Sequence, residues 1–305
     1  MPHIYAHRIA AESVLKRLSG SMGAIQRNAY FIGAQGPDPF FYERIFNSAL
    51  NIGTLLHQQD VDRSLSLMYA CAMGDETLRS YFCGYLCHYA LDQTAHPFIY
   101  ARSCTNDHTR FETQLDMALM EHYGESVIDT PPRSILPIDK KAVKTISNYY
   151  DRALKPVWDN IEEGLFERAY GKMLLVQRLA SDKTGMKGSL LRGIEKCTGK
   201  AHYVSGKLFD GKVRYQIDYL NLAQAPWISP WSDREKTDTF LNLLDSAVYL
   251  AESLCAAAMD AWARGQSAAP EAFGAKNFNT GMDWRTPADL SGGRCVFSAS
   301  GCTVP

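Results

Sequence analysis

The segment 85-YLCHYALDQTAHPFIY-100 places His88, Asp92 and His96 four residues apart. In a helix, residues i, i+4 and i+8 lie along one stripe, so these three side chains would point the same way. Apolar neighbours such as Tyr85 indicate that the stripe faces the protein interior. A buried histidine–aspartate–histidine stripe is costly unless a partner compensates it, and a divalent cation would do so. The segment therefore predicts a core helix that carries metal ligands.

The composition describes an ordinary globular protein with enough residues for a large core. The chain has 305 residues, of which 46% are hydrophobic and 21% are charged. Its formal net charge of -1 argues against a general electrostatic grip on nucleic acid, so we expect no stable nucleic-acid partner. The same charge offers no polybasic anchor for an anionic membrane.

The sequence shows no run of about eighteen apolar residues, so we expect no transmembrane segment. The N-terminal stretch MPHIYAHRIAAESVLKRL is polar and periodic, and it lacks the apolar core of a signal peptide. The expected location is therefore cytoplasmic. The sequence leaves the oligomeric state open.

Helical periodicity covers most of the chain, and strand-like alternation is scarce. The expected helices span residues 5–20, 42–57, 62–73, 76–99, 108–123, 139–182 as two helices, 186–195, 205–222 and 234–264. We predict an all-α fold, a single multi-helix bundle over residues 1–265 with a multinuclear metal site in its core. Residues 266–305 are rich in Gly, Ser and Ala, and we expect an irregular C-terminal tail there.

Seven of the eight histidines precede residue 123, and this skew requires a cause. In 108-HTRFE-112 an imidazole and a carboxylate lie one helical turn apart. Asp38 follows a Gly-Pro pair in a tight turn, His57 lies on an expected helix, and His3 is almost at the start of the chain. Imidazole and carboxylate ligands suit zinc and similar first-row ions, and the absence of a CxxC pair argues against a closed thiolate site.

Seven or eight such ligands exceed the four that one tetrahedral zinc ion takes. They fit two or three ions that share a bridging carboxylate, and Asp92, between two histidines on one stripe, is the expected bridge. Closely spaced metals of this kind stabilise the attacking and leaving oxygens when a phosphate ester is cleaved. A hydrogen-bonded core cluster without metal is the alternative, and the other histidines and carboxylates of the pattern argue against it.

The whole pattern resembles the zinc-dependent phospholipase C family, whose members are helical bundles that hold up to three zinc ions. The family is related more distantly to the S1/P1-type nucleases. The resemblance covers residues 1 to about 120. It rests on His3, Asp38 within GAQGPDPFFY, His57, His88, Asp92 and His96 within GYLCHYALDQTAHP, and His108 and Glu112 within HTRFE.

The resemblance implies three sets of zinc ligands and a reaction. The sets are Asp38, His57, His88 and Asp92 for the first ion; His96, His108 and Glu112 for the second; and His3, Asp92 and the amino terminus for the third. The implied reaction cuts a phospholipid on the glycerol side and leaves diacylglycerol and a phosphorylated head group. A zinc-activated water would attack phosphorus, and Asp38 would orient or deprotonate it as the catalytic residue.

Several single residues allow two interpretations. His7 lies one turn beyond His3 and competes with it as a ligand, although a supporting or surface position is the simpler role. Asp116, one turn past Glu112, either orients a histidine or is solvated. His122 and His202 are expected to be ordinary histidines.

Phe40, Phe41 and Tyr42 are the candidate substrate-binding residues, because aromatic rings can face a quaternary ammonium group. Core packing is the simpler role for at least two of them. Two other functions stay open. One is a nuclease-like or other phosphoesterase, which would need a base-stacking pocket or a basic groove. The other is a non-catalytic family member that binds metal structurally, and the complete ligand set argues against it.

Overall fold

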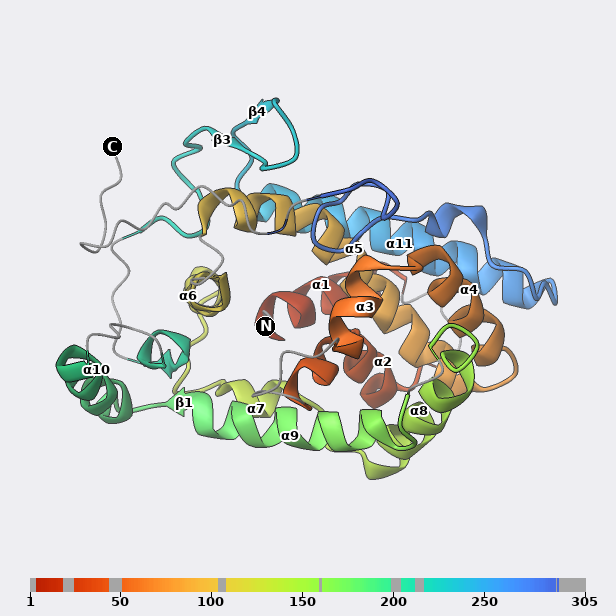
Figure 1. Ribbon diagram of the computed structural model, residues 1–305, viewed down its shortest axis with the longest axis horizontal. Coiled ribbons are helices and arrows are strands. Elements are labelled where there is room, and N and C mark those ends of the chain that lie inside the picture. Colours follow the sequence, from red (N-terminus) through yellow and green to blue (C-terminus); the bar gives the residue numbers. More distant parts are fainter. Residues whose placement is uncertain are drawn as a thin grey trace.

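The computed structural model describes residues 4–18, 25–43, 51–103, 108–158, 161–198, 204–211, 217–288 and 290. The long helix α5 (Glu76–Arg102) runs through the middle of the bundle (Figure 1). The helices that pack against it are α1 (Ile4–Arg17), α2 (Arg27–Gly33), α4 (Val61–Ala72), α6 (His108–His122), α8 (Lys140–Ala153) and α11 (Phe240–Ala263). This arrangement confirms the predicted all-α fold.

The sequence of α5 explains its central position. Its first turn is capped by Asp75, whose side chain accepts a hydrogen bond from the Leu78 backbone N–H at 3.0 Å. From Leu78 to Ile99 most of its side chains are buried on all sides, as expected for a helix inside a bundle. At Gly84 a Cβ atom would collide with the backbone carbonyl of Tyr30, so glycine allows α2 to approach α5 closely.

The remaining elements are short or lie at the periphery. The helices are η1 (Asp38–Tyr42), α3 (Ile52–Gln58), α7 (Pro132–Ile135), α9 (Leu165–Ala180), α10 (Met186–Thr198), η3 (Ser205–Lys207) and η4 (Glu271–Phe273). In the described part of the chain each strand has two residues. They are β1 (Ser181–Asp182) parallel to β2 (Phe209–Asp210), and β3 (Trp227–Ile228) antiparallel to β4 (Glu235–Lys236). The predicted scarcity of strands is therefore confirmed.

Two of the predicted helices are wrong in extent. In the described residues 205–211 and 217–222, the expected helix 205–222 is replaced by η3, β2 and turns, and Asn221 has a left-handed φ of 55°. The expected helix 234–264 begins at Phe240, because Thr239 and Asn242 form a capping box there. Within the expected helix 42–57 the described part is α3, since residues 44–50 lie outside the description.

Helix α11 is the one described helix that is long and apolar enough to cross a membrane, judged by length and composition. It packs along α5 and α1, and its residues Val248, Leu254 and Cys255 are buried in the core. A central helix of a bundle has the same composition, so the described residues show no clear transmembrane segment.

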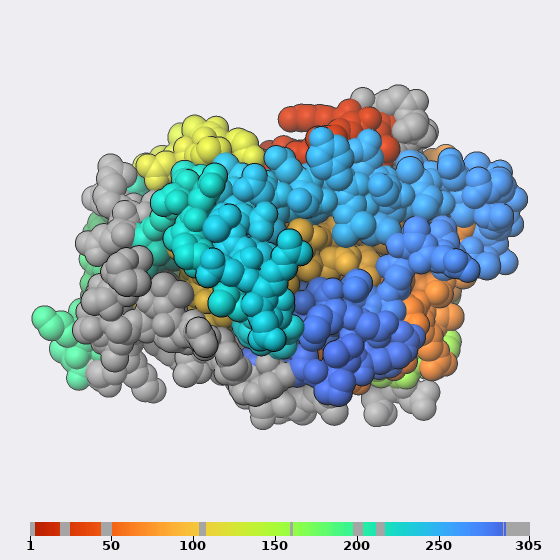
Figure 2. All heavy atoms as spheres, turned by 90° about the horizontal axis from the view of Figure 1, so that it is seen from above, coloured from red at the N-terminus to blue at the C-terminus, as the bar shows by residue number. Residues whose placement is uncertain are grey.

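Residues 266–288 contain η4 and turns, and they lie against α5 and α4 (Figures 1 and 2). The Tyr89 hydroxyl donates to the carbonyl of Phe273 at 3.0 Å, and the Trp284 indole donates to Asp62 at 2.8 Å. Phe278 is fully buried. This segment is therefore fixed to the bundle, whereas the assignment of residues 1–265 to one domain stays a prediction.

Candidate metal centre

A tight turn between α2 and η1 places Asp38 next to α5. Gly36 has a left-handed φ of 50°, and a Cβ atom there would collide with the ring of His88. Glycine is therefore required for the chain to turn directly over His88. The turn leaves Asp38 buried, with its Oδ1 3.9 Å from His88 Nε2.

The first cluster surrounds Asp38. His57 Nε2 lies 3.3 Å from Asp38 Oδ1 and 3.4 Å from Asp92 Oδ2. His88 Nε2 lies 3.1 Å from the same oxygen of Asp92. One ligand atom from each of Asp38, His57 and His88 can be chosen so that all lie within 4.8 Å of one another, a spacing that can hold one metal ion.

The second cluster joins α5 to α6. His108 Nε2 lies 2.8 Å from Glu112 Oε1, and His96 Nε2 lies 3.4 Å from the same oxygen. The rings of His96 and His108 stack at 5.6 Å between centroids. The HTRFE motif therefore meets the end of the α5 stripe, as the resemblance implied, and His96, His108 and Glu112 form a second group that can hold an ion.

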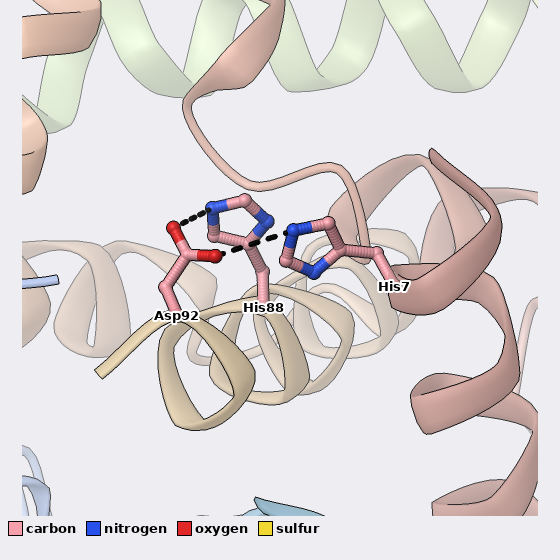
Figure 3. Close-up of side chains that lie close together, drawn as sticks. All are labelled: His7, His88 and Asp92. Atoms are coloured by element: carbon pink, nitrogen blue, oxygen red, sulfur yellow. Dashed lines mark ion pairs between the residues drawn. The ribbon is translucent and has the colours of Figure 1, made fainter. Parts of the chain in front are cut away.

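The third cluster contains His7, and here the structure corrects the simpler interpretation of that residue. His7 is 2% exposed, so it is not a surface histidine. Its Nε2 lies 3.3 Å from Asp92 Oδ1, while Asp92 Oδ2 faces His88 (Figure 3). The rings of His7 and His88 stack at 4.0 Å. His7, His88 and Asp92 form a third group that can hold an ion, whereas His3 lies outside the described residues.

The donor set fits metal ions better than it fits a hydrogen-bonded core. Within the described part of the chain, Asp38 Oδ2, His88 Nδ1 and His108 Nδ1 are buried without a hydrogen-bond partner. Buried polar atoms are normally hydrogen-bonded. Coordination to zinc would satisfy atoms of this kind, since imidazole nitrogen and carboxylate oxygen are its usual ligands outside thiolate sites.

The electrostatics of the centre favour bound cations. Burial alone would raise the pKa of Asp92, but His88 and His96 outweigh burial and hold this pKa well below its ordinary value. Burial alone would lower the pKa of His57, yet its contacts with Asp38 and Asp92 raise it to about 9. The two aspartates are therefore ionised, and without metal a histidine proton supplies part of the positive charge that they require.

Two backbone carbonyls orient the histidines. His57 Nδ1 lies 2.6 Å from the carbonyl oxygen of Gly53, and His96 Nδ1 lies 2.9 Å from that of Phe278. An N–H at Nδ1 donates to each carbonyl, so Nε2 points into the centre, where it can bind metal once its proton is displaced. The Phe278 N–H also donates to the carbonyl of His57 at 2.9 Å, so residue 278 holds two ligand-bearing helices at once.

Asp116 supports the centre in a way that the sequence did not indicate. It is fully buried, and its two oxygens accept hydrogen bonds from the backbone N–H groups of Tyr5 and Ala6 at 2.9 and 3.0 Å. A carboxylate from α6 therefore caps the start of α1. This cap fixes the helix that carries His7 to the helix that carries His108. Asp116 is therefore not solvated, and its hydrogen bonds within the described residues go to backbone N–H groups rather than to a histidine.

We expect Phe278→Ala to destabilise the protein by about 3–5 kcal/mol, because a buried phenyl ring would be replaced by a cavity. The ring lies 5.0 Å from His57 and 4.9 Å from Tyr89, between ring centroids. The loss is measured by urea unfolding of the zinc-loaded protein. An unchanged midpoint would show that the segment does not stabilise the centre.

A cavity of about 180 Å³ opens at the three clusters. Seven of the eight residues in the three clusters line it, and the eighth, His88, is fully buried. The other lining residues are Phe41, Thr54, Gln58, Tyr100 and Asn279. The clusters are therefore accessible from a cavity, which a closed structural metal site would not need.

Only one of the three candidate aromatic residues lines this cavity. Phe41 does so, and its ring lies 5.2 Å from that of His57. Phe40 is packed edge-on against Tyr150 at 5.0 Å, and Tyr42 is 1% exposed. The prediction of Phe40 and Tyr42 as substrate-binding residues is therefore wrong, because the η1 helix turns both rings into the core. His122 is exposed, as expected, and His202 lies outside the described residues.

Comparison with known proteins identifies one family. The model of the family described as zinc dependent phospholipase C matches residues 1–169, which include every residue of the three clusters. No curated protein and no solved structure matched the chain. The match spans more than half of the 305 residues and confirms the resemblance seen in the sequence. The chain therefore belongs to the zinc-dependent phospholipase C family.

Proposed function

We propose that the protein is a zinc-dependent phosphodiesterase that cleaves phospholipids on the glycerol side of the phosphate, releasing diacylglycerol and a phosphorylated head group. Family membership supports a phospholipase C-like hydrolase in general. The finer statement, which names the bond and the products, follows the reaction that the resemblance implies, and the composition of the cavity supports a phosphate ester as the substrate.

The charge of the cavity lining is the observation that carries this proposal. Three carboxylates, Asp38, Asp92 and Glu112, line the cavity, and no Lys or Arg is among its described lining residues. An anionic phosphate would be repelled by this lining. The phosphate can be bound when cations occupy the three histidine–carboxylate clusters. The cavity is therefore suited to a phosphate ester whose oxygens contact metal ions rather than basic side chains.

The clusters would hold two or three zinc ions. The ligands would be Asp38, His57, His88 and Asp92 for one, His96, His108 and Glu112 for another, and His7 with Asp92 for the third. Bound zinc would supply charge stabilisation to the phosphoryl oxygens and lower the pKa of a water molecule. His7 joins the set that the resemblance implied, since its Nε2 lies 3.3 Å from Asp92. His3 and the amino terminus, which lie outside the described residues, stay predicted ligands of the same ion.

Asp38 is the group that would take the proton from the attacking water. Its Oδ1 faces His57, while its Oδ2 has no hydrogen-bond partner among the described residues and Asp38 lines the cavity. An ionised carboxylate with one free oxygen can orient a water and accept its proton. The low pKa of Asp38, which His88 and His57 hold down against burial, keeps it ionised.

The test is product analysis with the zinc-loaded protein. Phosphatidylcholine in mixed micelles should yield diacylglycerol and phosphocholine, and the His122→Ala protein should behave like the wild type, since that side chain is exposed. Single-stranded DNA and RNA are assayed in parallel. Cleavage of nucleic acid with no release from lipid would instead establish the nuclease-like alternative, and no turnover of either with full zinc would indicate a non-catalytic metal protein.

A further inference from the structure

Helix α10 exposes a row of apolar side chains to solvent, whereas a helix of this kind normally buries its apolar face. Met186, Leu190 and Ile194 are 73%, 67% and 53% exposed. They are spaced i, i+4 and i+8, so they form one stripe along the helix. Large exposed apolar side chains that gather on one face mark an interaction surface.

The opposite side of α10 carries the polar contacts that hold it. The Gly188 N–H donates to Asp182 at 2.7 Å, and both aspartates of the β1–β2 pair lie close to this glycine. The buried Glu195 accepts hydrogen bonds from the backbone N–H groups of Val204 and Ser205. These contacts fix which side of the helix faces inward, so the apolar stripe cannot turn into the core.

The exposed charged residues in the described sequence on either side of α10 are all basic. Between residues 171 and 211 the three acidic residues, Asp182, Glu195 and Asp210, are buried. The exposed charged residues of the described part of this region are Lys172, Arg178, Lys183, Lys187, Lys196 and Lys207. Lys172 pairs with Glu43 at 2.9 Å, and the Lys187 ammonium donates to the carbonyls of Leu179 and Ser181, so Arg178, Lys183 and Lys196 contribute most to the positive charge near the helix. The net charge of -1 for the whole chain is therefore an average that includes a stretch whose exposed charges are basic.

We infer that the α10 surface, defined as the stripe Met186, Leu190 and Ile194 with its flanking lysines, docks the protein onto an anionic phospholipid surface. Apolar side chains that enter the acyl boundary, ringed by lysines that meet anionic head groups, are the requirements for an interfacial helix. The inference rests on the proposed function in one respect, because a phospholipid substrate would be found in a lipid surface.

Two other occupants fit this surface less well. A second copy of the chain docked through the same surface would place lysines opposite lysines. The C-terminal residues 291–305 contain one arginine and no acidic residue, so they offer no complement to the lysines.

The position of α10 relates the docking surface to the cavity. It lies at one end of the molecule, where the green atoms project in Figure 2. Helix α9 runs from this end to η1, which carries Asp38, and η3 contacts both α10 and α6. The cavity volume of about 180 Å³ is below that of pockets for drug-sized ligands, so the acyl chains of a phospholipid would stay outside it, in the membrane.

The test is cosedimentation of the full-length, zinc-loaded protein with vesicles of phosphatidylcholine, with and without phosphatidylglycerol. We expect binding to the anionic vesicles that weakens as salt is raised. The triple variant Met186→Ser, Leu190→Ser and Ile194→Ser should bind about tenfold more weakly or worse. Lys196→Gln should weaken binding about fivefold.

The matched control is Ile138→Ser with Leu222→Ser, which removes two exposed apolar side chains elsewhere and should bind like the wild type. The stripe variant should still hydrolyse a short-chain monomeric substrate, so that a loss of docking is distinct from a failure of catalysis. Equal vesicle binding by the wild type and the stripe variant would overturn the inference. Self-association of the wild type that the stripe variant abolishes, without vesicle binding, would assign the surface to a second copy instead.

Discussion

Asp92→Ala should lose bound zinc and lower phosphodiester hydrolysis about a thousandfold or more, because this carboxylate contacts all three clusters. Its oxygens lie 3.1–3.7 Å from nitrogens of His88, His7, His57 and His96. Metal ions in such centres contribute several kcal/mol of charge stabilisation, and about 1.4 kcal/mol corresponds to a tenfold change in rate. Zinc is measured by elemental analysis of the purified variant and activity by product release.

Asp92→Asn is the matched variant for folding, since it keeps the shape of the side chain and removes its charge. It should retain the helical circular dichroism of the wild type while zinc content and activity fall. Full activity in either variant would show that Asp92 does not bridge the clusters. The control is His122→Ala, which removes an exposed histidine of α6 outside the centre and should leave zinc content and activity unchanged.

Asp38→Asn should lower kcat about 10²- to 10⁴-fold while most of the zinc is retained, which is the range for loss of a general base. An amide oxygen can still occupy the ligand position, and His57 and His88 remain in the first cluster. The amide cannot accept the proton of the attacking water. Zinc content and kcat are therefore measured on the same preparation.

The base role predicts that the two quantities separate. If zinc and activity fall in proportion, Asp38 acts as a ligand alone. If activity is retained at full zinc content, Asp38 does not take the proton, and Glu112 becomes the next candidate, since it is the other carboxylate besides Asp92 that lines the cavity.

The stripe on α5 and the HTRFE motif could be predicted because their geometry is local. Residues four apart on a helix share a face, so the sequence determines that His88, Asp92 and His96 point together. Gly36 likewise explains from the sequence why a tight turn precedes Asp38, although its closeness to His88 depends on how α2 crosses α5.

The contribution of His7 could not be predicted with the same clarity. Its position depends on α1 crossing α5, and the cap from Asp116 that fixes α1 joins residues 110 and 111 positions apart in sequence. Periodicity places His7 on a helix and gives no information on what lies opposite. Packing between helices distant in sequence decides whether this histidine is buried beside Asp92 or lies on the surface.

The carbonyl of Phe278 could not be found from side-chain motifs at all. Every residue has a backbone carbonyl, so the acceptor that orients His96 leaves no signature in the sequence. The segment around it is also poor in periodicity, which led us to expect an irregular tail there. The signal for packing in this segment is its aromatic residues, Phe273, Phe278 and Trp284, whose large apolar side chains favour burial.

The zinc content of the purified wild-type protein, measured by elemental analysis beside His88→Ala, tests the central claim most directly. His88 belongs to two of the three clusters, so its loss should remove more than one ion. We predict two or three zinc ions per wild-type chain and a clear fall in the variant. One ion or none, unchanged in the variant after zinc is supplied, would contradict it and show that the buried histidines and aspartates are a hydrogen-bonded core.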